Sequence, residues 1–186
     1  MIITEQKPFD EILNSIKEYK NVFLLGCSEC AAICQTGGSE QVKEMAAKLE
    51  ENGKKIITGT LMIDSPCDER ITKRDVRLVK EEIEKADVLV SMACGLGTQS
   101  LTTITGKKVV PALNTKFYGT VERLGRFHEK CCGCDSCVLL EHGGECPVVK
   151  RKKCKSCGRL LQYDSKNCDI CKSEDLEVTE ARTIIW

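Results

Sequence analysis

Cysteines are the residues of this chain whose type and spacing most clearly predict chemistry. The 186 residues include 14 of them, at positions 27, 30, 34, 67, 94, 131, 132, 134, 137, 146, 154, 157, 168 and 171. The chain begins MIITEQKPFDEI, without the basic, apolar and cleavage regions of a secretory signal peptide. We therefore expect a cytoplasmic, reducing location, where clustered thiols serve as metal ligands or redox groups more often than as disulfides.

The first cysteine set lies in the segment GCSECAAICQTGG and at two more distant positions. A 4Fe-4S cluster needs four thiolates around a cube, and here one loop offers several while a distant cysteine completes the set. Five candidates compete for four places, and the sequence leaves open which one is left out. The alternative is that Cys27 and Cys94 are merely small buried apolar residues. The candidates are Cys27, Cys30, Cys34, Cys67 and Cys94.

The second set lies in the segment HEKCCGCDSCVLLEHGGECPVVK. Its spacing follows the bacterial ferredoxin pattern C-x2-C-x2-C with a remote C-P, apart from a longer gap before the last cysteine, and it predicts a second 4Fe-4S cluster. Four-coordinate zinc is the alternative, because four thiolates suit either metal. Cys132 is expected to be a spare thiol, and His128 and His142 to be surface residues. The predicted ligands are Cys131, Cys134, Cys137 and, less firmly placed, Cys146.

The third set consists of two C-x2-C pairs separated by about ten residues, the arrangement of a zinc ribbon. A hairpin is expected between the pairs, and structural zinc would supply the folding free energy of this segment. A mononuclear iron of the rubredoxin kind is the alternative. The predicted ligands are Cys154, Cys157, Cys168 and Cys171.

The elements that must position the first set read as an α/β fold. Apolar strands alternate with amphipathic helices, which predicts a small doubly wound parallel sheet. Strands are expected at residues 22–25, 55–63 with a break at Gly59, 88–90 and 109–110. Helices are expected from Pro8 to Asn21, from the Gly37-Gly38-Ser39 turn to Gly53, and after a capping box at Thr72–Asp75.

This fold would bring the five thiols of the first set together. Sites in α/β proteins collect beyond the carboxyl ends of the strands. Cys27 ends the first predicted strand, and Cys67 and Cys94 follow the second and third. We therefore expect all five thiols at one edge of the sheet. The glycines of the Gly95-Leu-Gly segment are interpreted as a tight turn beside Cys94, because the third glycine of a dinucleotide-binding turn is missing.

Composition divides the chain into three predicted domains: an α/β domain at 1–127, a ferredoxin-like cysteine loop at 128–150 and a zinc-ribbon tail at 151–186. Lys and Arg number 28 and Asp and Glu 28, so the net charge is zero and nucleic-acid binding is not favoured. No apolar run approaches the roughly 20 residues that span a bilayer. The basic stretch from Lys150 to Arg159 is interpreted as a solvated face or a docking patch for an acidic partner such as ferredoxin.

Five segments together resemble a known family. EQKPFDEI, GCSECAAICQTGGSEQV, SMACGLGTQ, KVVPALNT and CCGCDSCVLLEHGGECPV are similar to the small iron–sulfur subunit of anaerobic methylenetetrahydrofolate reductase, the methylenetetrahydrofolate reductase C-terminal zinc-binding domain family. The resemblance covers about residues 1 to 150. After Val149, Arg151 takes the place of a family cysteine and the ribbon follows, which leaves the identity of the partner open.

The resemblance implies a role in electron transfer. In that family the subunit pairs with a flavin-bearing catalytic barrel, and the nine cysteines of the first two sets match family cysteines. We therefore expect two 4Fe-4S clusters, zinc, a flavoprotein partner in anaerobic one-carbon metabolism, and ferredoxin or another electron carrier. No catalytic acid, base or nucleophile set stands out. The alternatives are a structural or docking module, and an iron–sulfur enzyme with its substrate at the first cluster.

Overall fold

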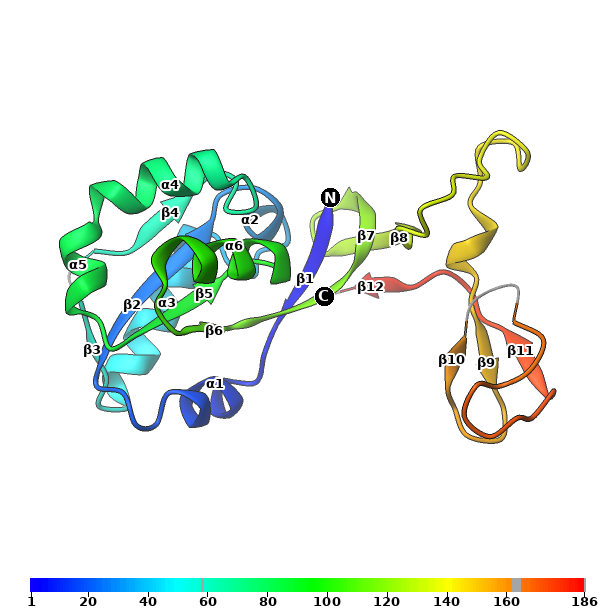
Figure 1. Cartoon of the computed structure of the whole chain (residues 1–186), viewed down its shortest axis with the longest axis horizontal. Helices are drawn as coiled ribbons and strands as arrows, with labels where there is room; N and C mark the ends of the chain where they lie inside the picture. The colour runs from blue at the N-terminus through cyan, green and yellow to red at the C-terminus, as the bar shows by residue number, and fades with distance from the viewer. Residues whose placement is uncertain (58, 162–164, 186) are drawn as a thin grey trace. The chain divides into compact units, whose positions relative to one another are not determined.

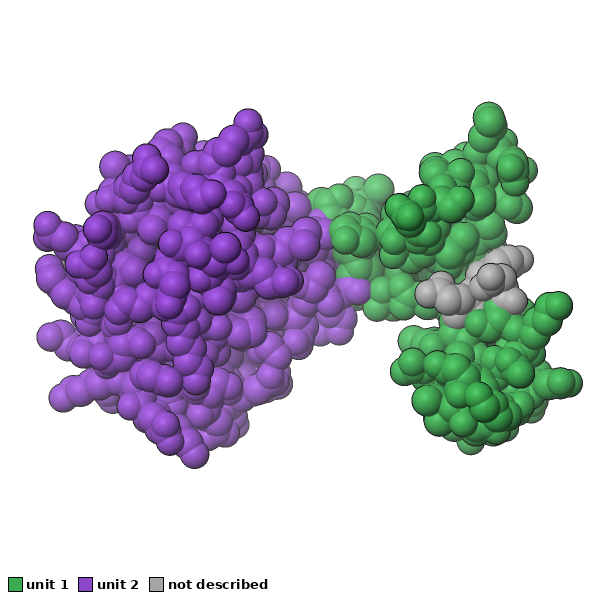
Figure 2. All heavy atoms as spheres, viewed as in Figure 1, with its two compact units in different colours: residues 1, 117–186 green, residues 2–116 purple. Residues whose placement is uncertain are grey.

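The structure is a computed structural model that describes residues 1–57, 59–161 and 165–185. The chain divides into two compact units (Figure 2). We call residues 2–116 the N-terminal unit, which is unit 2 of the figure, and residue 1 with residues 117–186 the C-terminal unit. The domain boundaries expected after residues 127 and 150 stay predictions.

A parallel sheet forms the centre of the N-terminal unit (Figure 1). Its strand order is β3, β2, β5, β6, and β4 also pairs with β2. This confirms the predicted α/β class with a parallel sheet. The strand expected at 55–63 is two short strands on either side of Gly59, and Thr58 lies outside the described residues. The strands are β2 (Asn21–Cys27), β3 (Lys55–Ile56), β4 (Leu61–Ile63), β5 (Val88–Met92) and β6 (Val109–Pro111).

Helices cover both faces of this sheet. Successive residues of β2 and β5 point to opposite faces, so each face presents apolar side chains on which helices pack. Leu24 and Val90 pack on one face against α1 (Phe9–Ser15) and α3 (Ser39–Glu51). Phe23 and Leu89 pack on the other face, against α5 (Lys80–Lys85) and α6 (Gly95–Thr105), with side chains of α4 (Glu69–Leu78) alongside. The two apolar layers hold the unit together.

Two helix predictions were wrong in their limits. Helix α1 ends at Ser15 rather than near Asn21, where β2 already begins. The capping box at Thr72–Asp75 does not start a helix, because both residues are buried inside α4. Asp68 caps α4 instead, by accepting a 2.9 Å hydrogen bond from the Arg70 backbone N–H. The tight turn expected at Gly95 is the first turn of α6.

The C-terminal unit is built from antiparallel strands, and the sequence patterns predicted none of those that lie outside the ribbon. Strand β7 (Leu113–Arg123) begins in the N-terminal unit beside β1 (Ile2–Gln6), and its later part pairs with β8 (Arg126–Cys131). Strand β12 (Thr183–Ile185) pairs with the other side of β8. A 3-10 turn at Pro147–Val149 precedes a second small sheet of order β10, β9, β11: Leu160–Leu161, Lys152–Cys154 and Leu176–Val178.

A buried carboxylate ties these pieces of the C-terminal unit together. The Glu129 side chain on β8 is 1% exposed and accepts hydrogen bonds from Arg182 Nε at 2.7 Å and Arg151 Nη2 at 3.0 Å. The Arg182 guanidinium also lies 5.0 Å from the centre of the Phe117 ring. The carboxylate therefore connects β8 with the residues that precede β9 and β12.

No described helix combines the length and the apolar character needed to cross a bilayer.

Candidate metal centres

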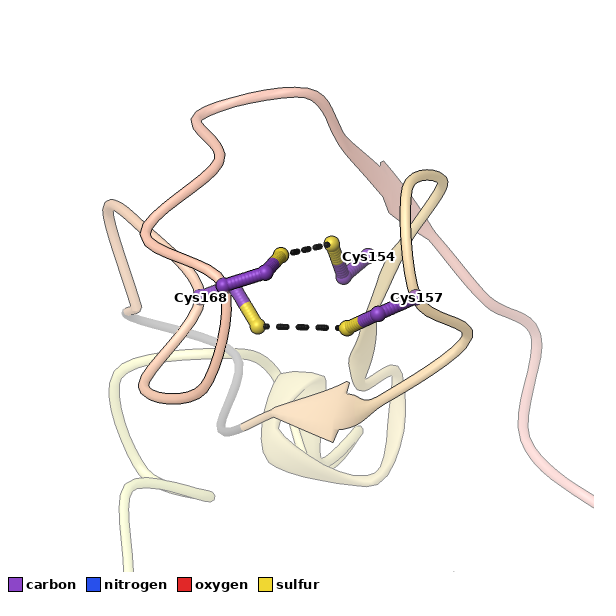
Figure 3. Close-up of side chains that lie close together, drawn as sticks. Cys154, Cys157 and Cys168 are labelled. Carbon is purple, nitrogen blue, oxygen red and sulfur yellow. Dashed lines mark hydrogen bonds between the residues drawn. The ribbon is translucent and has the colours of Figure 1, made fainter.

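The four thiols predicted for the ribbon converge on one point (Figure 3). The Cys154 and Cys171 sulfurs lie 3.5 Å apart, as do those of Cys157 and Cys168. All four sulfurs lie within 4.8 Å of one another. Four thiolates about 2.3 Å from a central zinc ion would be just under 4 Å apart, so the arrangement fits a tetrahedral metal ion. The metal identity is not fixed by this geometry, because iron accepts the same ligands.

Local backbone geometry shapes this group of thiols. Cys154 ends β9, and the Gly158 N–H donates to the Cys154 carbonyl at 2.8 Å, which closes a tight turn around Cys157. The Lys172 N–H closes a similar turn on the Cys168 carbonyl at 3.1 Å. Each C-x2-C pair is thus a turn whose two thiols face the other pair. The hairpin expected between the pairs includes residues 162–164, which lie outside the described residues.

Hydrogen bonds shift the pKa values of the four thiols in different directions. Burial disfavours the Cys154 thiolate, but the Cys157 backbone N–H and the Cys171 thiol outweigh it and lower the pKa of Cys154 to about 6. The Arg159 backbone N–H favours the Cys157 thiolate, but the Cys168 and Cys171 sulfurs raise the pKa of Cys157 to about 12. The metal-free group therefore holds protons that a metal ion must displace.

The cysteine loop after β8 lines an open cavity of about 230 Å³. Its lining includes all four thiols predicted for the second cluster: Cys131, Cys134, Cys137 and Cys146. Cys132 lines a second cavity of about 390 Å³, which Cys134 lines as well. Burial raises the pKa of Cys132, and the neighbouring Cys134 sulfur raises it further. Four thiols beside an open cavity suit the predicted 4Fe-4S cluster. Bound iron and sulfide stay a prediction.

The first cysteine set lies at the carboxyl ends of the parallel strands. Cys27 is the last residue of β2, and Cys30 starts α2 (Cys30–Ile33). Cys94 follows β5 and caps α6, while Cys67 lies between β4 and α4. Cys27 packs against Ala93, the neighbour of Cys94. This part of the chain thus gathers the candidate ligands at one edge of the sheet.

Electrostatic interactions connect the five thiols of this set. Burial raises the pKa of Cys27, and the nearby Cys30 and Cys94 sulfurs raise it further. Burial also raises the pKa of Cys67, again with contributions from Cys94 and Cys30. Burial also raises the pKa of Cys34; the Thr4 backbone N–H and hydroxyl oppose that rise, and the Cys30 sulfur adds to it. In the metal-free state Cys27, Cys34 and Cys67 therefore favour their protonated form.

Two close contacts of glycines fix the loops that carry this set. A Cβ at Gly37 would lie 1.9 Å from the Met92 carbonyl oxygen, so only glycine lets the segment after α2 pass against β5. A Cβ at Gly97 would lie 2.9 Å from the Pro66 side chain, so glycine lets Cys67's neighbour pack on the start of α6. These contacts bring the loops of Cys27, Cys67 and Cys94 together.

Sequence patterns missed some residues that position the candidate ligands. The Thr115 hydroxyl accepts a 2.8 Å hydrogen bond from the Gly95 N–H, directly after Cys94. Thr115 ends the segment KVVPALNT, one of the five segments that resemble the family. The resemblance assigns no role to Thr115. Glu129 also escaped notice, because a single acidic residue in a strand gives no signal until its two arginine partners are placed beside it.

Comparison with known proteins gives one family match. Residues 110–181 match the model of a family described as Methylene-tetrahydrofolate reductase C terminal. The matched region contains the second and third cysteine sets and extends past Val149, where the resemblance was expected to end. The first set lies outside the matched residues. No curated protein matches the chain.

One of the similar solved structures is the crystal structure of arylmalonate decarboxylase. That protein shares 14% sequence identity at a TM-score of 0.35. The alignment covers 55% of this chain and 45% of the decarboxylase, so it spans less than half of that protein.

Proposed function

We propose that this chain is an iron–sulfur electron-transfer subunit of a methylenetetrahydrofolate reductase-type complex, relaying electrons to or from a flavin-bearing catalytic subunit. The observation that carries the proposal is the family match, because residues 110–181 contain both C-terminal cysteine sets. The convergent sulfurs of Cys154, Cys157, Cys168 and Cys171 support a metal-binding subunit.

Each predicted cofactor has a donor set suited to it. Cys131, Cys134, Cys137 and Cys146 would hold one 4Fe-4S cluster, because they line one cavity. The first cysteine set would hold a second one at the edge of the parallel sheet. The ribbon thiols would hold zinc as a structural ion. When bound, the clusters supply one-electron chemistry, and the protein sets their potential through burial and hydrogen bonds to sulfur.

Half of the six cations in the basic stretch from Lys150 to Arg159 are paired with carboxylates. Arg151 is paired with Glu129, Lys155 with Asp175 and Arg159 with Asp169. Lys152 Nζ donates to the Ser165 carbonyl at 2.8 Å. Nucleic-acid affinity depends on unpaired cations that displace counterions from phosphate. We therefore favour a protein partner, a flavoprotein or a ferredoxin-like carrier.

Electron relay can be tested with the Cys134→Ser variant. The full chain is produced anaerobically together with a methylenetetrahydrofolate reductase-type flavoprotein, and reduction of the flavin by dithionite-reduced chain is followed by its visible absorbance. Wild type and the Cys132→Ser control should reduce the flavin at similar rates. Cys134→Ser should lose one cluster and most of the rate, while the zinc stays. An unchanged rate and iron content in Cys134→Ser would contradict the second cluster assignment.

A second candidate function is a structural or docking module that carries zinc alone. It is favoured by one observation: in the described part of the chain, the ribbon thiols are the single group of three or more candidate ligands close enough for one metal ion. A module of this kind would show no visible absorbance at about 400 nm, where iron–sulfur clusters absorb. Absorbance of the anaerobically purified chain separates the two functions.

A further inference from the structure

The first cysteine set offers five thiols to a cluster that needs four, and one of them, Cys34, already contacts β1. The inference below rests on the proposed function, because it concerns the ligands of the first iron–sulfur cluster. The five residues differ in what their side chains already contact.

Cys34 already has a hydrogen-bond partner outside the group of thiols. Its side chain is fully buried, and its Sγ donates to the Ile2 carbonyl oxygen of β1 at 3.7 Å. The Thr4 hydroxyl of the same strand lies 2.6 Å from the Thr36 hydroxyl, and Thr36 donates to the Ala31 carbonyl at 3.2 Å. These contacts join the end of α2 to β1. Cys34 therefore already has a structural role that a protonated thiol fills.

Cys27 and Cys94 lie at the carboxyl ends of two neighbouring strands, β2 and β5. Gly26 of β2 is in register with Met92 of β5, and Cys27 packs in one apolar cluster with Ala93. Cys94 comes directly after Ala93, at the start of α6. The two thiols thus lie on adjacent loops at the same sheet edge.

Cys67 approaches the same place from β4. The Ser28 N–H donates to the Ile63 carbonyl at 2.9 Å, which fixes the end of β4 beside the residue after Cys27. Pro66 packs against Gly97 in the first turn of α6. The loop of Cys67 is therefore held between the loop of Cys27 and the loop of Cys94. Cys67 is exposed, so it would lie at the solvent side of a cluster.

We infer that Cys27, Cys30, Cys67 and Cys94 hold the first cluster, and that Cys34 is a structural thiol that fastens α2 to β1. Cys30 completes the set because it begins α2 directly after the Cys27 loop. Four thiolates occupy all four irons of a 4Fe-4S cluster, so no iron remains open for a substrate. The assignment thus favours electron transfer over the alternative of an iron–sulfur enzyme at this site.

The test compares Cys34→Ser with Cys67→Ser in the full chain purified anaerobically. Serine can keep the hydrogen bond to the Ile2 carbonyl but binds iron poorly. Cys34→Ser should keep the wild-type iron and sulfide, about eight iron atoms per chain. Cys67→Ser should lose up to half of the iron and, after oxidation, show the EPR signal of a three-iron cluster. Zinc content and circular dichroism of both variants report whether the fold is retained.

The assignment is overturned if Cys34→Ser loses iron while its circular dichroism is unchanged. Should Cys34→Ser fail to fold, the decision passes to Cys67→Ser, because this exposed residue takes no part in core packing. Full iron content in Cys67→Ser would then overturn the assignment. A failure of the proposed function looks different, since the wild-type chain itself would contain no iron.

Discussion

The two units of this chain are stabilised by different interactions. The N-terminal unit buries two layers of aliphatic and aromatic side chains against a parallel sheet. In the ribbon of the C-terminal unit, by contrast, the apolar cluster consists of Cys154, Leu161 and Cys168, with Leu176 beside it. A core this small cannot offset the conformational entropy lost on folding, so metal and buried ion pairs must contribute the difference. This contrast predicts which changes each unit tolerates.

Loss of the ribbon metal should have the largest effect. Structural zinc contributes about 10–16 kcal/mol of apparent binding free energy in small zinc modules, and this energy is coupled to folding. Cys157→Ser should therefore abolish zinc binding and unfold the ribbon, while the N-terminal unit keeps its melting transition. Hydrogen exchange read by mass spectrometry would locate the change. The Ser156→Ala variant is the matched control, and exchange spread evenly over both units would contradict the contrast.

Removal of the buried Glu129 carboxylate should be the next largest effect. It leaves two arginines without the partner that they share, and breaking a buried ion pair costs about 3–5 kcal/mol. Glu129→Ala should lower the free energy of unfolding of the C-terminal unit by that order, as measured by denaturant titration of the zinc-loaded protein. Glu177→Ala, at an exposed position of β11, is the control and should change little. Equal stability of the two variants would remove Glu129 from its role.

A cavity in the apolar core should affect the N-terminal unit alone. Leu24 is fully buried in β2, and Leu→Ala at such a position costs about 2–5 kcal/mol. Leu24→Ala should lower the denaturation midpoint of this unit without changing the zinc content. The control is Leu140→Ala, because Leu140 is 97% exposed. A loss of zinc from Leu24→Ala would show that the two units are not independently stabilised.

Protonation of the Glu129 carboxyl in mild acid should produce the smallest of these effects, in the C-terminal unit. Burial by itself would raise the pKa of the Glu129 carboxyl, but Arg182 and Arg151 outweigh it and hold the pKa below its usual value of 4.5. A depressed pKa means that the folded state favours the charged carboxylate, so its stabilising contribution is complete above pH 4.5 and is lost as the pH falls further. Unfolding titrations between about pH 6 and about pH 3 cover the range in which a carboxylate titrates. Over this range the free energy of unfolding should show a decrease that Glu129→Gln lacks.

The sequence predicted the N-terminal unit better than the C-terminal one for a physical reason. Buried parallel strands such as Val22–Leu25 appear as short continuous apolar runs, and each was found in the sheet. Strand β8 reads Arg-Phe-His-Glu-Lys-Cys, and its only fully buried apolar residue is Phe127, so no periodic pattern is visible. Its place in a sheet depends on pairing with β7 and on the Glu129 ion pairs, which link residues far apart in the chain.

Helix limits failed where tertiary contacts override local signals. Thr72 and Asp75 have the spacing of a capping box, but Thr72 donates to the Pro66 carbonyl from inside α4. The cap is Asp68, which also pairs with the Arg70 guanidinium. The contacts of Pro66 with Thr72 and with Gly97 of α6 involve residues outside α4, so a pattern within α4 does not contain them.

The candidate ligands were predictable to different degrees. The C-x2-C pairs of the ribbon set the turns that aim their thiols, so spacing alone predicted the convergent group. The first set is different, because its thiols come from loops after three strands. Only the placement of α2 against β1 shows that Cys34 has another partner. Sequence spacing could therefore name five candidates and not choose among them.

The most direct measurement is metal analysis of the full chain after anaerobic purification. An electron-transfer subunit with two clusters and a ribbon should contain about eight iron atoms, about eight sulfide ions and about one zinc ion per chain. Iron and sulfide in this ratio, with visible absorbance that bleaches on reduction, would support the proposed function. A chain that carries zinc alone, with no sulfide, would contradict it.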